Sequence, residues 1–145
     1  MDGGAYHADA TPEEAWKILS SEPGAALVDV RTAAEWAYVG LPDLSATSAP
    51  LLRVEWQTYP HNEINPDFVA TVDQALRRAG ASPDAPIFFL CRSGVRSAAA
   101  AAAMTATGYS RCYNVAGGFE GRRDESGHRG SVEGWKAAHL PWVQS

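Results

Sequence analysis

Residues 87–97 read IFFLCRSGVRS, and this stretch decides how the rest of the chain is interpreted. It opens with four apolar residues, a pattern typical of a strand that is covered on both faces. Residues 97–107 follow as a predicted helix that includes six consecutive alanines at 98–103, and alanine is the strongest helix former. The stretch therefore predicts a buried strand, a tight loop and a helix, with Cys91 as the first residue of the loop.

The same alternation of strands and helices continues along the chain. Thr11-Pro12-Glu13-Glu14 has the form of a capping box with proline at the first helical position, and Ala26–Val30 predicts a short buried strand after that helix. Residues 65–79 predict a helix that Gly80 ends, and Cys112–Val115 predicts a third strand. This order predicts an α/β fold of three layers, α/β/α, with a mainly parallel central sheet.

Other segments are less regular. Ala33–Tyr38 is expected to form a short helical turn, and Leu51–Trp56 an edge strand or an irregular wall. Residues 120–134 are polar and rich in glycine, which predicts an expanded loop, and Trp135–His139 is expected to form a last helix. Because no repeat divides the chain, residues 1–145 are expected to form one domain.

Composition narrows the classes of partner. The formal net charge of −5 argues against a nucleic-acid or anionic membrane surface, because both require clustered positive charge. The longest apolar tract, at 98–104, is too short to span a bilayer. Met1–Ala10 lacks the basic and then apolar pattern of a signal peptide, and two cysteines make no disulfide framework. We therefore expect a cytoplasmic protein with free thiols, and no nucleic-acid or membrane partner.

The position of Cys91 points to chemistry. In open α/β sheets, ligands bind beyond the carboxyl ends of the strands, where helix N-termini present free amide hydrogens that stabilise a negative sulfur atom. Gly94 permits a tight loop, while Arg92 and Arg96 supply guanidinium groups that match an oxyanion. Cys91 is therefore the predicted catalytic nucleophile. The predicted substrate-binding residues are Arg92, Ser93, Gly94, Val95 and Arg96.

A plainer interpretation treats Cys91 as a small apolar residue that ends a core strand, because free cysteine is commonly buried. The two arginines and the glycine within five residues of it would then each need a separate reason.

The loop CRSGVRS at 91–97 resembles the active-site loop of the rhodanese family of sulfurtransferases. Upstream, LVDVR at 27–31 and Glu35-Trp36 are similar to that family's first conserved block. Downstream, NVAGG at 114–118 and WKAA at 135–138 extend the resemblance, which spans about residues 5–142. It implies a rhodanese-like domain.

The resemblance implies a ping-pong transfer of sulfur that needs no metal or organic cofactor. Cys91 would attack the outer sulfur of a small anionic donor such as thiosulfate, form a persulfide, and pass the terminal sulfur to cyanide or a thiol. Arg92 and Arg96 would hold the donor and stabilise the leaving sulfite. A sulfur-relay protein is a further partner consistent with this chemistry.

The chain also departs from the family's pattern. Residues 39–44 read VGLPDL where the family usually has GHIPGA, and the gap between the paired glycines and Trp135 is expanded to 119–134. We expect these departures to alter donor and acceptor preference. They leave open which of four further side chains line the pocket: Trp36, Tyr38, His128 and Arg129.

Other polar residues receive structural interpretations. Asp29 is out of phase with its apolar strand neighbours, and a buried carboxylate needs a partner, so Asp29 and Arg31 are expected to pair near the site. Cys112 is expected to be a core residue. The histidines show no metal-ligand spacing, and no metal site is expected; they are His7, His61, His128 and His139.

Two alternative functions remain open at this stage. A cysteine-dependent phosphatase or arsenate reductase uses a similar strand, loop and helix, but the related phosphatases resemble a pattern with five residues between cysteine and arginine. Only four separate Cys91 from Arg96, which favours a sulfur atom over a phosphate. The other alternative is a persulfide carrier or a regulatory rhodanese-like module that acts with a protein partner.

Overall fold

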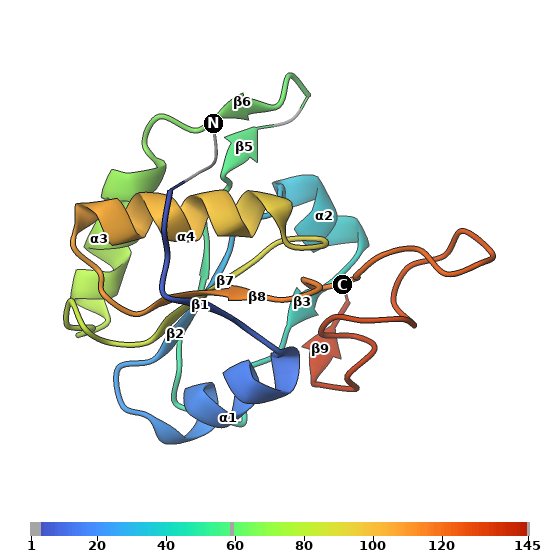
Figure 1. The fold of residues 1–145 in the computed structure, drawn as a ribbon, viewed down its shortest axis with the longest axis horizontal. Helices are drawn as coiled ribbons and strands as arrows, with labels where there is room; N and C mark the ends of the chain where they lie inside the picture. The colour runs from blue at the N-terminus through green and yellow to red at the C-terminus, as the bar shows by residue number, and fades with distance from the viewer. Residues whose placement is uncertain (1–3, 59, 145) are drawn as a thin grey trace.

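The central sheet has five parallel strands (Figure 1). The computed structural model describes residues 4–58 and 60–144, so the ends of the predicted domain and residue 59 lie outside the described residues. The strand order is β1-β8-β7-β2-β4, which confirms the predicted parallel sheet. The strands are β1 (Ala8–Ala10), β2 (Ala26–Asp29), β4 (Leu51–Arg53), β7 (Ile87–Leu90) and β8 (Cys112–Val115).

Helices cover both faces of this sheet. α1 (Pro12–Ser21) lies on one face, and α3 (Phe68–Arg78) and α4 (Val95–Thr107) lie on the other (Figure 1). α2 (Ala33–Tyr38) follows β2 directly. The predicted capping box of α1 is present, since the Thr11 side chain accepts from the Glu14 amide while the Glu14 carboxylate accepts from the Thr11 amide. The three-layer arrangement is therefore the predicted one.

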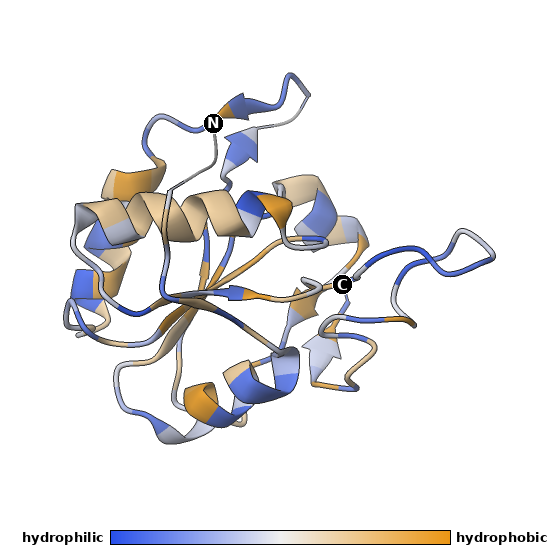
Figure 2. Cartoon of the chain, viewed as in Figure 1, coloured by the Kyte–Doolittle hydropathy of each residue, from blue (hydrophilic) through white to orange (hydrophobic). Residues whose placement is uncertain are grey.

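Two apolar clusters fill the spaces between these layers. Alternate residues of a strand point to opposite faces, so Phe89 packs toward α3 and α4 while Phe88 packs toward α1. Because both faces are covered, the central strands are mostly hydrophobic, with Asp29 and Asn114 as polar exceptions, whereas the segment after β8 is mostly hydrophilic (Figure 2). Each large apolar side chain buried in this way contributes about 1.5–3 kcal/mol to stability.

Short elements interrupt the predicted alternation. β3 (Leu41–Pro42) pairs antiparallel with β9 (Trp142–Val143), and β5 (Gln57–Thr58) pairs antiparallel with β6 (Glu63–Ile64). These strands and β1 were not expected, because runs of two or three residues carry little periodic signal.

Three predicted helix positions need correction. α4 begins at Val95, ahead of the expected Ser97. α3 begins at Phe68 and not at Asn65, because a residue before proline avoids the helical region and the Asn65 side chain accepts from the Asp67 amide in a turn. Residues 135–139 form turns and no helix, and His139 there adopts a φ of 60°.

The main chain after β8 crosses directly behind the Cys91 loop. The Phe119 amide donates to the Cys91 carbonyl at 2.8 Å, and the Glu120 and Gly121 amides both donate to the Arg92 carbonyl at 3.0 Å. Gly118 makes this approach possible, because a Cβ there would lie 2.5 Å from the Cys91 carbonyl oxygen. We call this contact between residues 118–121 and the loop the glycine clamp.

We expect Gly118→Ala to disrupt the glycine clamp. The new methyl group adds about 1–3 kcal/mol of overpacking to the cost of about 1–2 kcal/mol for a non-glycine residue at positive φ. Gly127→Ala is the matched control, because Gly127 also has positive φ but nothing lies within 4 Å of its Cβ position. Urea denaturation should show a clearly larger loss for Gly118→Ala, and equal losses would contradict the steric role of Gly118.

Candidate functional site

The site lies at the point where successive strands along the chain are added to opposite sides of β2. β2 is followed along the chain by β4 on one side, and β7 is then added on the other side of β2. Such switch points are where open α/β sheets bind ligands, beyond the carboxyl ends of the strands. Cys91 is the residue immediately after β7, and only 2% of its surface is exposed.

The sulfur of Cys91 lies among hydrogen-bond donors from α4. Its Sγ accepts from the Gly94 amide at 3.1 Å and from the Ser97 amide at 3.4 Å, and it lies 3.2 Å from the Ser97 hydroxyl. Gly94 precedes the first residue of α4 and has a φ of 116°, a left-handed conformation that glycine adopts without steric cost. Donors and the helix dipole therefore converge on the sulfur, an arrangement that stabilises negative charge there.

Ser97 was not among the predicted site residues. It is fully buried, in the first turn of α4, and it contributes two of the three donors to the sulfur. A hydroxyl residue six positions after the cysteine was the available signal, but only the helix geometry shows that it turns inward.

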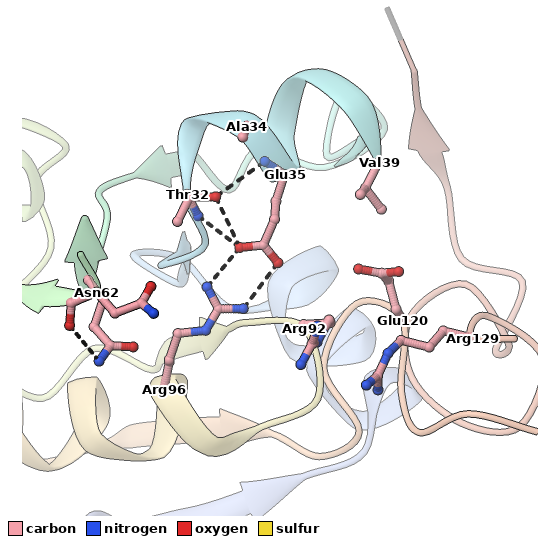
Figure 3. A pocket seen from close by; sticks show the side chains of 10 residues that line it. Thr32, Ala34, Glu35, Val39, Asn62, Arg92, Arg96, Glu120 and Arg129 are labelled. Atoms are coloured by element: carbon pink, nitrogen blue, oxygen red, sulfur yellow. Dashed lines mark hydrogen bonds and ion pairs between the residues drawn. The ribbon is translucent and has the colours of Figure 1, made fainter. Parts of the chain in front are cut away.

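Arg96 is engaged by an acidic partner from α2. Its guanidinium donates to both carboxylate oxygens of Glu35, at 2.7 and 3.0 Å, and both side chains are about one-fifth exposed (Figure 3). Glu35 also completes the capping box of α2, accepting from the Thr32 amide at 3.1 Å. The pair thus ties the Cys91 loop to the start of α2.

The predicted pair of Asp29 and Arg31 is present and fully buried. The Arg31 guanidinium donates to both oxygens of Asp29, at 2.9 and 2.7 Å, and to the Gly40 carbonyl at 2.7 Å. Its Cζ lies 4.3 Å from the centre of the Phe119 ring. Arg31 therefore links the end of β2 to the chain after β8.

A pocket of about 650 Å³ lies beside the Cys91 loop, and Arg92 and Arg96 of that loop line it while Cys91 itself does not. Arg92 and Arg129 both reach it, and no ion pair to either is found within residues 4–58 and 60–144 (Figure 3). Of the four side chains left open by the sequence, Arg129 is the one among the lining residues. The pocket is lined by Thr32, Ala34, Glu35, Val39, Gln57, Asn62, Arg92, Arg96, Glu120 and Arg129.

Hydrogen bonds organise the expanded segment that carries Arg129. Asp124 accepts from the Ser126 and His128 amides, each at 2.9 Å, and the Gly130 amide donates to the Glu120 carbonyl at 2.7 Å. The Arg129 guanidinium donates to the Gly121 carbonyl at 2.6 Å. Residues 120–134 therefore place the positive charge of Arg129 at the pocket.

The second cysteine lies in the core. Cys112 is fully buried in β8, and burial raises the pKa of its thiol to about 11, with a smaller opposing effect from Thr105. In the part of the chain that the structure describes, no three side chains of His, Cys, Asp or Glu are placed to hold a metal ion. No helix of the described residues is long and apolar enough to cross a membrane.

The sequence matches the Rhodanese-like domain over residues 11–125. The chain belongs to the rhodanese family. It is 30% identical over 133 residues to the thiosulfate sulfurtransferase GlpE of Actinobacillus succinogenes, covering 92% of this chain and 87% of that protein. This agreement confirms the resemblance that the sequence motifs indicated.

Two further relatives cover nearly the whole chain. The crystal structure of Rv0390 from M. tuberculosis shares 45% identity, with a TM-score of 0.86 over 97% of this chain and 100% of that one. The uncharacterized RP600 homolog of Rickettsia rickettsii is 38% identical over 129 residues, which is 89% of this chain and 91% of that protein.

We expect Glu35→Gln to lower the free energy of unfolding at pH 7 by about 1–2 kcal/mol, because it breaks a partly buried charged pair. Burial raises the pKa of Glu35, but the hydrogen bond and charge of Arg96 outweigh it and hold that pKa below 4.5. The contribution of the pair is therefore present above about pH 4.5 and is lost as the pH falls through the lower, folded-state pKa.

Urea denaturation at pH 7 and at pH 3.5 measures this effect. The difference between wild type and Glu35→Gln should shrink at the lower pH, whereas the exposed Glu125→Gln should differ little from wild type at either pH. A difference that stays constant with pH would contradict the ionic role of Glu35.

Proposed function

We propose that this protein is a sulfurtransferase that moves sulfane sulfur from a donor such as thiosulfate to cyanide or a thiol through a persulfide on Cys91. The observation that carries this proposal is the convergence of the Gly94 amide, the Ser97 amide and the Ser97 hydroxyl on the Cys91 sulfur. Such donors stabilise the thiolate that attacks and later leaves. No step requires a metal or an organic cofactor.

The two half-reactions balance without an external oxidant or reductant. In the first, the Cys91 thiolate forms a bond to the outer sulfur of thiosulfate, and the S–S bond of thiosulfate breaks to release sulfite. In the second, cyanide bonds to the terminal sulfur of the persulfide, the bond between that sulfur and Sγ breaks, and its electron pair returns to Cys91. Thiocyanate leaves and the thiolate is restored.

The charges of the pocket support an anionic donor. Arg96 remains a predicted donor-binding residue together with loop residues 92–95, but its guanidinium is already bound bidentately by Glu35. We therefore propose that Arg92 and Arg129 supply the larger share of the attraction for the donor, since both reach the pocket without an acidic partner among the described residues. Arg96 then mainly orders the loop.

The same pair argues against phosphate chemistry. A cysteine-dependent phosphatase needs the arginine of its loop to face the phosphate, and here Nη1 and Nη2 of Arg96 both donate to Glu35 instead. The short loop of four residues between Cys91 and Arg96 favours sulfur in the same way.

Exposed apolar side chains beside the pocket support a protein as sulfur acceptor or donor. Val95, at the tip of the Cys91 loop, is 80% exposed, and Tyr38, next to the lining residue Val39, is 81% exposed. We propose a sulfur-relay protein as a partner on this rim.

The compartment that fits this chemistry is the cytoplasm, where both free cysteines stay reduced.

Intact mass spectrometry tests the proposed reaction. Incubation with thiosulfate should add one sulfur atom to the wild type, and cyanide should remove it as thiocyanate. Cys91→Ser should give no adduct, whereas Cys112→Ser should still form it because Cys112 lies in the core. A wild type that takes up no sulfur from thiosulfate, or an adduct that persists in Cys91→Ser, would refute the proposal.

Steady-state kinetics test the role of Arg129. We expect Arg129→Gln to raise the KM for thiosulfate about threefold to fivefold with little change in kcat, as expected for loss of one partly exposed charge. Arg129→Lys should stay close to wild type because it keeps the charge. Arg123→Gln is the control, since Arg123 is exposed and does not line the pocket. An unchanged KM in Arg129→Gln would remove Arg129 from the donor site.

A further inference from the structure

A chain of hydrogen bonds connects the Cys91 sulfur to the edge of the sheet. The Ser97 hydroxyl lies 3.2 Å from the sulfur and 2.5 Å from the side-chain oxygen of Asn114. The Asn114 amide donates to the Asp9 carboxylate at 3.2 Å, and the Tyr6 hydroxyl donates to the same carboxylate oxygen at 2.7 Å. These groups are separate from the residues that line the pocket.

The register of the sheet builds this chain. β1 and β8 pair in parallel with Asp9 directly opposite Asn114, so the two side chains meet across the strands. Asn114 is only 6% exposed and Ser97 is fully buried. Buried polar groups such as these are stabilised only when they keep hydrogen-bond partners.

This chain of hydrogen bonds has two possible arrangements of its protons. Ser97 has one hydroxyl proton, and both the Cys91 sulfur and the Asn114 oxygen lie within reach of it. An ionised carboxylate only accepts, so Asp9 holds the NH₂ group of Asn114 toward itself and the oxygen toward Ser97. The hydroxyl therefore turns to the sulfur when the sulfur is a thiolate, and to Asn114 when it is not.

We propose that Ser97 is a catalytic hydrogen-bond donor that promotes release of sulfur from the Cys91 persulfide, and that Asn114 and Asp9 are positioning residues that hold its alternative acceptor. This inference rests on the sulfurtransferase function proposed above. In the persulfide, Sγ is bonded to a second sulfur and is a weak acceptor, so the hydroxyl binds Asn114. As the S–S bond breaks and the electron pair returns to Sγ, the hydroxyl turns to the developing thiolate. The proton stays on Ser97 throughout.

The two half-reactions depend differently on this donor. Loading consumes the thiolate, and a hydrogen bond that favours the thiolate also lowers its nucleophilicity, so the two effects partly cancel. Discharge creates the thiolate as leaving group, and there the donor only helps. Loss of the Ser97 hydroxyl should therefore slow discharge more than loading.

Asp9 supplies a variant with the opposite effect. Without its carboxylate the Asn114 NH₂ group loses its charged acceptor and keeps a contact with the Tyr6 hydroxyl, so the side chain can rotate and present the NH₂ group to Ser97, which leaves the hydroxyl proton to the sulfur. Asp9→Ala should therefore favour the thiolate. Asp9→Asn is the matched control, because it removes the charge but keeps an acceptor oxygen for Asn114. Asp9 lies on the edge strand and is exposed, so both variants should fold.

Two measurements on the full chain test the proposal. The first is the rate of alkylation of Cys91 by iodoacetamide against pH, followed by peptide mass, which needs no sulfur transfer. The second is a pair of single-turnover rates, loading by thiosulfate and discharge by cyanide.

Tyr6 stays a donor because its hydrogen bond to Asp9, together with burial, raises its pKa. The charged or titratable groups around the sulfur and its hydrogen-bond chain are Asp9, Tyr6, Arg92, Arg96, Glu35 and Asp29.

For Ser97→Ala, we expect the pH midpoint of alkylation to rise by about one unit and discharge to slow about tenfold, with loading changed less than about threefold. Ser97→Thr should restore both values. Asp9→Ala should lower the midpoint and speed discharge, while Asp9→Asn stays at the wild-type values.

An unchanged midpoint in Ser97→Ala, equal slowing of loading and discharge, or equal shifts in Asp9→Ala and Asp9→Asn would overturn the proposal. If Ser97→Ala fails to fold, the two Asp9 variants decide. If the wild type forms no persulfide but the midpoints of the variants shift as expected, sulfur transfer is refuted and Ser97 remains the donor to the thiolate.

Discussion

The hydrogen bonds between residues 119–121 and the carbonyls of Cys91 and Arg92 are the constraint on which the site depends. A loop can direct its amides at one atom only if its carbonyls find partners elsewhere, because buried backbone groups must be paired. The glycine clamp provides those partners from the chain after β8. Since the Trp135 amide in turn donates to the Gly118 carbonyl at 2.8 Å, the clamp is itself held by the last part of the chain. A local feature of the loop thus depends on two other segments, residues 118–121 and the turn at Trp135.

Charge is divided between two tasks at this site. Arg96 and Glu35 bind one another and join the Cys91 loop to α2, so their net charge toward a ligand is small. Arg92 and Arg129 face the pocket without such partners among the described residues, and Glu120 lies beside them (Figure 3). Arg129 comes from the segment in which this chain departs from the family's usual length. Variation in that segment would therefore change what binds at the pocket while the residues around the Cys91 sulfur stay the same.

The sequence predicted what is local and missed what joins distant residues. The strand, loop and helix around Cys91, the capping box of α1 and the pair of Asp29 and Arg31 all lie within short stretches, and each was found. Glu35 and Arg96 are 61 residues apart, and Asp9 and Asn114 are 105 apart, so only the strand register and helix packing bring them together. Trp135–His139 misled for the opposite reason. Its residues favour a helix locally, but contacts with Gly118 and Pro141 impose turns.

The 2% exposure of Cys91 also determines which oxidation products its thiol can form. A disulfide between two copies would need their sulfur atoms about 2.05 Å apart, and the walls of the recess keep two such loops from approaching that closely. Small oxidants such as peroxide are not excluded in this way, so the expected oxidation products are the oxyacids of Cys91 and not disulfide-linked dimers. A sulfur atom added to Cys91 would cover Sγ, so such an oxidant would react with the added atom first. The persulfide proposed above would then protect Sγ from irreversible oxidation.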